Sequence, residues 1–96
     1  LSAFQRFADK YLSEEELNQI RNYLAHNPEN GDVIVDTGGL RKIRFAAKGK
    51  GKSGGVRVIY YYHNPNMPLF LLTGYPKNMQ ADITSAQKKQ LRSLVP

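Results

Sequence analysis

Apolar residues near the start of the chain recur with the period of an α-helix. Their spacing of i, i+3, i+4 and i+7 is that of the apolar stripe of an amphipathic helix, formed by Phe4, Phe7, Ala8 and Tyr11. The pattern therefore predicts a first helix that lays one face on a core.

A second helix is indicated directly after the first. Ser13-x-x-Glu16 has the form of a capping box, in which each residue satisfies a backbone N–H of the other. Pro28 and the pair Asn30-Gly31 are stop signals at the far end. The expected buried positions are Leu17, Ile20 and Leu24. Two short, adjacent helices of this kind predict a helical hairpin with its acidic side chains toward solvent.

From Asp32 onward the apolar residues follow the period of β-strands. Runs rich in β-branched and aromatic residues alternate with turns that contain Gly or Pro, the pattern of an antiparallel meander. The runs are DVIV (32–35), LRKIRF (40–45), VRVIYYY (56–62) and PLFLLTGY (68–75). Residues 69–75 are the most apolar, so we expect that strand in the centre of the sheet.

The last segment predicts one more helix. Thr84-x-x-Gln87 forms a second capping box. Leu91, Leu94 and Val95 are expected to return to the core, with Lys88, Lys89 and Arg92 outside. The whole pattern predicts one α+β domain over residues 1–96, in which an N-terminal helical hairpin and a C-terminal helix pack on a small antiparallel β-sheet.

Composition and charge narrow the class of partner. The 96 residues are 41% hydrophobic and 23% charged, contain no cysteine, and hold no apolar run near the ~18 residues of a membrane span. The net charge of +6 is uneven: residues 1–36 carry three basic and seven acidic side chains, and residues 37–96 carry eleven basic side chains and Asp82. Such a positive half favours nucleic acid as ligand, with an anionic membrane surface as the weaker alternative.

The segment AAKGKGKSGG (46–55) contains two glycine-rich phosphate-binding patterns. Gly49-x-Gly51-x-x-Gly54 matches a dinucleotide fingerprint, and Gly51-Lys52-Ser53 matches the end of a P-loop. Both motifs must open a helix, because the phosphate lies at the helix N-terminus. A strand-forming run follows instead, so the sequence excludes a nucleotide cofactor site here.

The same segment is better explained as a phosphate-contacting hairpin connection. Lysines at every second position of an extended segment point to one side, here Lys48, Lys50 and Lys52. Arg57 stands just inside the next strand, and Lys42 and Arg44 share one face of the preceding strand. Together they predict a surface for an RNA or DNA backbone.

Tyrosine and histidine side chains can have roles in RNA binding and metal binding, respectively. Tyr61 shares a strand face with Arg57 and Ile59, where it either packs in the core or stacks an unpaired base. His26 and His63 are far apart and have no carboxylate at ligand spacing, so a metal site is not expected.

The blocks TGGLRKIRFAAKGKGKSGGVRVIYYYH (37–63) and LLTGYPKNMQADIT (71–84) resemble the RelE superfamily of bacterial toxin–antitoxin systems, specifically its HigB-like branch. NPENGD (27–32) fits the same branch, and the resemblance covers about residues 4–95. It implies a RelE/ParE-like fold. The family begins with one further strand before the first helix, which here would precede Leu1.

The resemblance implies a ribosome-dependent mRNA endonuclease without metal or cofactor, in which the RNA 2′-OH is the nucleophile. By match to the family motif the catalytic residues are Lys50, Lys52, Arg57 and Lys77. The RNA-binding residues are Lys42, Arg44, Lys48, Tyr61 and Asn78. Asn78 replaces a second arginine of the best-known members, and Thr84 replaces a downstream tyrosine that stacks the base.

The implied partners are a cognate antitoxin, expected to be a helix-turn-helix DNA-binding protein, and the ribosome with its mRNA. No membrane or small-molecule cofactor is expected, and the cytoplasm is the expected location. Two other functions stay open: a ParE-like gyrase poison, which would not need the Lys/Arg cluster, and a basic RNA-binding module without catalysis.

Overall fold

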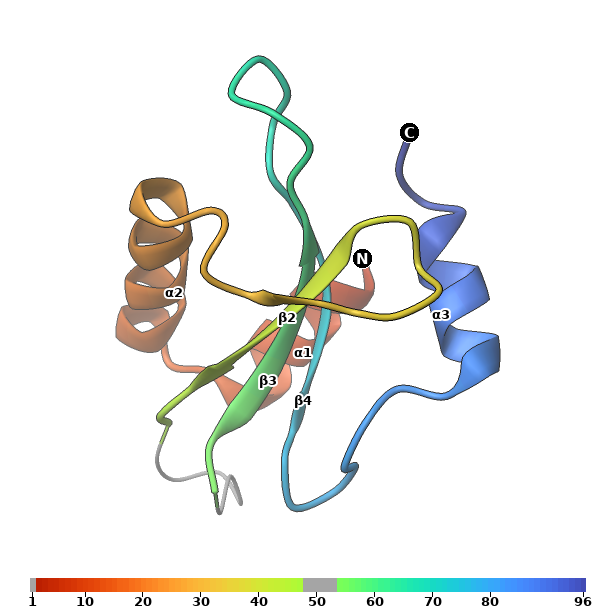
Figure 1. Ribbon diagram of the computed structural model, residues 1–96. Coiled ribbons are helices and arrows are strands. Elements are labelled where there is room, and N and C mark those ends of the chain that lie inside the picture. Colours follow the sequence, from red (N-terminus) through yellow and green to blue (C-terminus); the bar gives the residue numbers. More distant parts are fainter. Residues whose placement is uncertain (1, 48–53) are drawn as a thin grey trace.

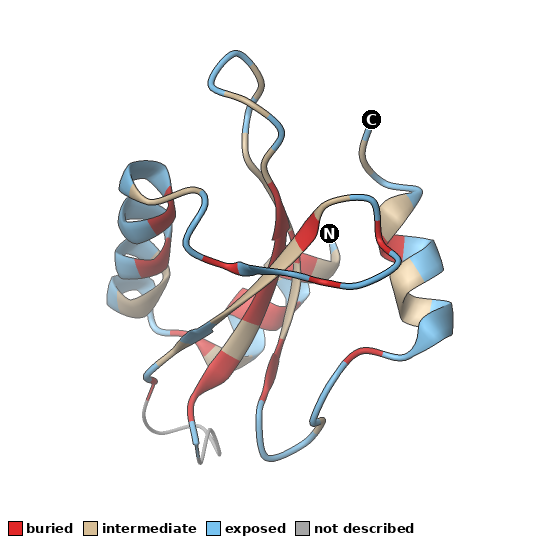
Figure 2. Ribbon diagram, viewed as in Figure 1, coloured by how far each residue is buried: buried red, intermediate tan, exposed pale blue. Residues whose placement is uncertain are grey.

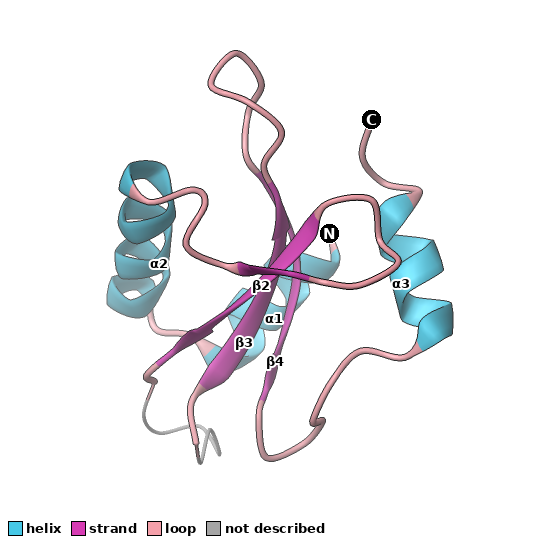
Figure 3. Ribbon diagram, in the orientation of Figure 1, coloured by secondary structure: helices cyan, strands magenta, loops and turns pink. Residues whose placement is uncertain are grey.

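The computed structural model describes residues 2–47 and 54–96, and two helices, four strands and a third helix follow one another along it (Figures 1 and 3). Their bounds are α1 Ala3–Tyr11, α2 Glu14–His26, β1 Asp32–Val33, β2 Leu40–Phe45, β3 Val56–Tyr61, β4 Phe70–Pro76 and α3 Ser85–Arg92. The strands form one antiparallel sheet, and the helices lie at both ends of the described chain. The predicted α+β fold is confirmed.

Both predicted capping boxes are present. At the start of α2, the Glu16 N–H donates to Ser13 Oγ at 3.1 Å and the Ser13 N–H donates to Glu16 Oε1 at 2.9 Å. Thr84 and Gln87 repeat this exchange at the start of α3. An N-cap of this kind contributes about 1 kcal/mol. These local interactions fix where α2 and α3 begin, independently of the sheet.

The order of strands in the sheet is β1-β2-β3-β4, and every neighbouring pair is antiparallel. The expectation that residues 69–75 form a central strand was wrong, because β4 pairs only with β3 within the described residues. Its apolar character comes from the helices that flank it. Strands β2 and β3 each have a neighbour on both sides, and β3 is the more deeply buried of the two.

The first strand is shorter than the predicted run 32–35. Only Asp32 and Val33 pair with β2, because the chain turns directly after them. The Thr37 hydroxyl donates to the Ile34 carbonyl at 2.6 Å and accepts from the Leu40 N–H at 3.1 Å. Together with the backbone bond from the Ile34 N–H to the Leu40 carbonyl at 2.8 Å, these two bonds close the tight turn that leads into β2.

The two faces of β3 belong to two separate apolar clusters, and Figure 2 shows the buried run along this strand. Val56, Val58 and Tyr60 face α1 and α2 and contact Phe4, Phe7, Ile20 and Leu24 in one cluster. Ile59 and Tyr61 lie in the other cluster, together with Leu91 of α3. We call the second face of the sheet the α3 side.

Tyr60 fastens the connection between α2 and β1 to the sheet. Its hydroxyl donates to the Pro28 carbonyl at 2.8 Å and accepts from the Gly31 N–H at 2.8 Å. Burial raises the pKa of Tyr60, with the Gly31 hydrogen bond and the Arg41 charge opposing the shift. The hydroxyl is therefore a structural group on the side of the sheet away from α3.

The C-terminal helix packs as predicted at Leu91, which is buried, while Val95 packs at the edge of the same cluster. Leu94 was expected in the core and is instead 59% exposed, because α3 ends at Arg92 and the helical period stops there. Arg92 was expected to point outward, but its Cζ lies 5.5 Å from the centre of the Tyr61 ring. This arginine therefore holds α3 against the sheet.

The entry into β3 requires glycine. Gly54 and Gly55 both have a φ of 82°, a conformation that other residues adopt only with strain. A Cβ on Gly55 would lie 2.5 Å from the Phe45 carbonyl oxygen, whereas a Cβ on Gly54 would meet nothing within 4 Å. Close contact with β2 is thus specific to Gly55.

We therefore expect Gly54→Ala to lower the free energy of unfolding by about 1–2 kcal/mol, the cost of the left-handed backbone alone. Gly55→Ala should cost a further 1–3 kcal/mol or so, because the methyl group also forces β2 and β3 apart. Urea unfolding of both variants measures this difference. Equal destabilisation would contradict the close approach at Gly55.

Candidate functional site

Three polar side chains form a row across the α3 side of the sheet. Arg57 of β3 is directly opposite Arg44 of β2 and directly opposite Tyr75 of β4. Directly opposite residues of an antiparallel pair point to the same face, with their Cβ atoms about 5 Å apart. We call Arg44, Arg57 and Tyr75 the cross-strand row.

The row places two arginines opposite each other. Like charges in this position destabilise a sheet by roughly 0.2–1 kcal/mol. Strands β2, β3 and β4 contain no acid that could compensate them; Asp32 of β1 is opposite Lys42, and Asp82 also pairs with Lys42. An arrangement that costs stability and concentrates positive charge on one face is typical of a surface that binds an anion.

Arg57 is the anchored member of the row. It is half-buried, follows the fixed turn at Gly55, and its Nε has no hydrogen-bond partner among the described residues. Arg44 is exposed. A phosphate can therefore bind the guanidinium of Arg57, which the fold holds in place, and the exposed guanidinium of Arg44, which can adjust its position.

Lys42 lies one row further along the same face, opposite Ile59. Its Nζ is 3.5 Å from Asp82 Oδ2, and both side chains are partly exposed. The hydrogen bond from the Ile83 N–H and the charges of Lys42 and Lys88 lower the pKa of Asp82, with partial burial opposing them. An exposed pair of this kind is weak, so Lys42 can exchange Asp82 for a phosphate.

Lys77 and Asn78 follow β4 in a turn, and both are exposed. The Lys77 N–H donates to the Gly55 carbonyl at 3.1 Å, which extends the β3–β4 ladder past Pro76. This bond places Lys77 beside Gly55 at the start of β3, and Gly55 precedes Arg57 by two residues. The structure brings this predicted residue to the same end of the sheet.

The predicted residues Lys48, Lys50 and Lys52 lie outside the described residues. The segment that contains them joins Ala47, next to the end of β2, to Gly54, next to the start of β3. Both of its ends therefore lie at the Arg44 and Arg57 end of the strands, where Phe45 pairs with Val56.

Tyr61 does not fit the predicted role of stacking an RNA base. Its side chain is 6% exposed. His63 stacks against the ring with centroids 6.2 Å apart and 12° between the planes, and Arg92 lies over it as well. Because its neighbours occupy the ring, the alternative of core packing accounts for Tyr61.

Tyr75 is the member of the site that sequence reasoning missed. It is 8% exposed, and its hydroxyl has no hydrogen-bond partner among the described residues. Burial raises the pKa of Tyr75, the Asp82 charge adds to the shift, and the Arg57 charge opposes it. Its approach to Arg57 arises from strand register, which the linear sequence does not reveal.

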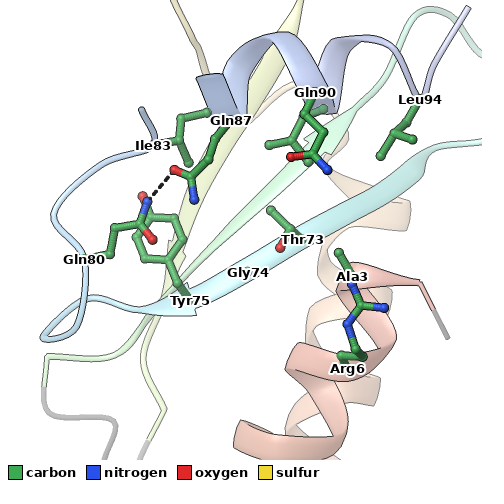
Figure 4. A pocket seen from close by; sticks show the side chains of 11 residues that line it. Ala3, Arg6, Thr73, Gly74, Tyr75, Gln80, Ile83, Gln87, Gln90 and Leu94 are labelled. Atoms are coloured by element: carbon green, nitrogen blue, oxygen red, sulfur yellow. Dashed lines mark hydrogen bonds between the residues drawn. The ribbon is translucent and has the colours of Figure 1, made fainter. Parts of the chain in front are cut away.

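A pocket of about 300 Å³ lies along the outer edge of β4 between α1 and α3, and Tyr75 of the cross-strand row is one of its lining residues (Figure 4). Ala3, Arg6 and Thr73 line its lower part, with Gln87 and Gln90 above. Gln80 and Gln87 bind each other and not a ligand, because Gln80 Nε2 donates to Gln87 Oε1 at 2.8 Å. Charged groups are sparse there, so the cross-strand row is the better anion site.

The described part of the chain offers neither a metal site nor a membrane-spanning helix. Residues 2–47 and 54–96 contain no group of three His, Asp or Glu side chains that could hold a metal ion. Within the same residues, the helices are too short and too polar to cross a membrane.

Comparison with known protein families identifies the family of this chain. The family model described as the RelE toxin of the RelE/RelB toxin–antitoxin system matches residues 2–95, nearly the full length of the chain. The match covers the helical hairpin, the sheet and α3 together. With its α+β fold and the basic face of its sheet, the chain belongs to the RelE toxin family.

Proposed function

We propose that this toxin is a ribosome-dependent mRNA endoribonuclease of the HigB-like branch. The observation that best supports this function is the cross-strand row, in which Arg44 and Arg57 face each other at a cost to the sheet. A phosphodiester backbone is the ligand that offsets this cost. The sequence blocks at 37–63 and 27–32 support the HigB-like branch.

The proposed reaction uses a nucleophile that the substrate itself carries. The RNA 2′-oxygen bonds to phosphorus, the bond from phosphorus to the 5′-oxygen breaks, and the products are a 2′,3′-cyclic phosphate and a 5′-hydroxyl. The enzyme has to accept the proton of the 2′-OH, stabilise the crowded phosphate and supply a proton to the 5′-oxygen. The substrate supplies the attacking oxygen, so a metal-activated water has no place in this step.

Each proposed catalytic residue fits one of these tasks. Lys50 and Lys52 are proposed to transfer the protons, because the match to the family motif assigns them a catalytic role. The planar guanidinium of Arg57 can bind two phosphate oxygens at once. Lys77, at the same end of the sheet as Arg57, adds a point charge. Lys42, Arg44, Lys48 and Asn78 are proposed to bind the RNA backbone on either side of the cut.

The proposed partners follow from the same charge distribution. We expect an antitoxin with a helix-turn-helix DNA-binding region whose acidic segment covers the α3 side of the sheet, since residues 37–96 carry eleven basic side chains and one acid. The ribosome and its mRNA are the target, which places the protein in the cytoplasm.

Purified toxin should cut ribosome-bound mRNA well and naked mRNA poorly, because its few groups of intermediate pKa need the ribosome to orient the 2′-OH. Primer extension on both substrates measures this, and cuts in phase with codons are expected. Equal cleavage of the two substrates contradicts ribosome dependence. Gyrase-linked DNA breaks with intact mRNA would instead identify a gyrase poison.

Arg57→Ala should lower mRNA cleavage by about 10²–10³-fold, the usual effect of removing one preorganised donor from a developing negative charge. Arg57→Lys should also fail, because it keeps the charge and loses the two-pronged geometry. Arg21→Ala is the matched control, since Arg21 is an exposed arginine of α2. Antitoxin co-purification reports folding, and a folded Arg57→Ala toxin with wild-type activity removes Arg57 from the mechanism.

A further inference from the structure

We propose that the hydroxyl of Tyr75 donates a hydrogen bond to the scissile phosphate beside Arg57, which makes Tyr75 a catalytic residue of this toxin. Nothing in the sequence pattern assigned a role to this side chain. The identity of the ligand as an RNA phosphodiester rests on the endonuclease function proposed above. The placement of Tyr75, its missing partner and its protonation state each support the contact.

The placement of Tyr75 depends on an irregularity in β4. Ile59 pairs with Thr73 and Tyr60 pairs with Leu71, so one extra residue, Leu72, is inserted in β4. If the register of Tyr60 and Leu71 continued unbroken, Arg57 would face Gly74 and Tyr75 would point to the opposite side of the sheet. Bulges of this kind commonly re-aim a side chain next to an active site.

Arg57 and Tyr75 both carry a buried polar atom that lacks a partner among the described residues. These atoms are Arg57 Nε and the Tyr75 hydroxyl oxygen. Buried donors without an acceptor are rare in folded proteins, and each calls for an explanation such as an absent ligand. Because the two residues are directly opposite in the β3–β4 ladder, one phosphate group can accept from both.

The chemistry of the hydroxyl suits a neutral donor. Burial raises the pKa of Tyr75 above its ordinary value of 10.0, with Asp82 adding to the shift and Arg57 opposing it. Tyr75 is therefore protonated at neutral pH and can donate. A neutral donor also adds no further positive charge to a face that already holds Arg44 and Arg57.

The phosphate has to displace a neighbouring segment to reach the hydroxyl, which is covered in the free protein. Residues 77–84 run past this end of β4 without regular secondary structure before α3 begins (Figure 3). Asp82 belongs to this segment and is held by the exposed pair with Lys42 at 3.5 Å. In the bound state the phosphate takes the place of the Asp82 carboxylate beside Lys42.

Tyr75→Phe tests this contact, because it removes only the hydroxyl. We expect kcat for ribosome-bound mRNA to fall about 10²-fold, with a smaller change in KM, since the bond strengthens as charge develops on the phosphate. The melting temperature should stay the same or rise slightly, because no hydrogen bond to a described residue is lost.

Tyr60→Phe is the matched control. This buried tyrosine of the neighbouring strand loses two hydrogen bonds, to Pro28 and Gly31, and lies on the other face of the sheet. Its melting temperature should fall, and its kcat below that temperature should equal the wild-type value. The pair of variants thus separates a loss of stability from a loss of catalysis.

A Tyr75→Phe toxin with wild-type kcat overturns the assignment, and so does one whose activity falls only in proportion to a lower melting temperature. If the wild-type toxin cuts no mRNA, the proposed function fails and binding of a 2′-O-methyl oligoribonucleotide decides the contact. Weaker binding by Tyr75→Phe than by Tyr60→Phe supports it, and equal binding overturns it.

Discussion

Strand β3 is buried on both faces, and its position sets the positions of the helices and strands around it. Val56, Val58 and Tyr60 pack toward α1 and α2, while Ile59 and Tyr61 pack toward α3. Both clusters therefore include residues of β3. A shift of the β3 register by one residue would move each of these side chains to the opposite face of the sheet. The fold protects this register at both ends of the strand: Gly55 permits the close approach of β2, and Tyr60 binds the connection that precedes β1.

The same register builds the candidate site. Fixing β3 places Arg57 opposite Arg44, and the extra residue in β4 brings Tyr75 opposite Arg57. The facing arginines lower the stability of the free protein, and so do the two buried polar atoms that lack a partner among the described residues. A bound phosphodiester offsets both costs, because it accepts hydrogen bonds and neutralises charge. The site is thus carried by rigid strands, with the lysine-rich connection after Ala47 joined to its end. Such a scaffold suits a reaction in which the enzyme supplies charge and orientation and the RNA supplies the nucleophile.

Local signals were sufficient for most of the fold but not for the assembly of the site. The capping boxes at Ser13 and Thr84 and the two faces of β3 could be read from spacing alone, because both depend on neighbours in sequence. The position of β4 at the end of the order and the exposure of Leu94 could not, since they depend on which elements pair and on where α3 stops. Tyr75 was missed for a related reason, because its side of the sheet is set by the bulge at Leu72. Arg57 lies opposite Arg44 on the α3 side and its role stays a prediction, whereas Tyr61 is enclosed by His63 and Arg92.

An NMR titration of labelled toxin with a 2′-O-methyl oligoribonucleotide shows directly whether RNA binds on the α3 side of the sheet. The side-chain Nε–H resonance of Arg57 should shift most, together with the amides of β2, β3 and the end of β4, while α1 and α2 stay unchanged. The shifts should weaken as salt is added, since phosphate contacts release counterions. Shifts confined to the acidic helices α1 and α2, with Arg57 unaffected, would contradict the account.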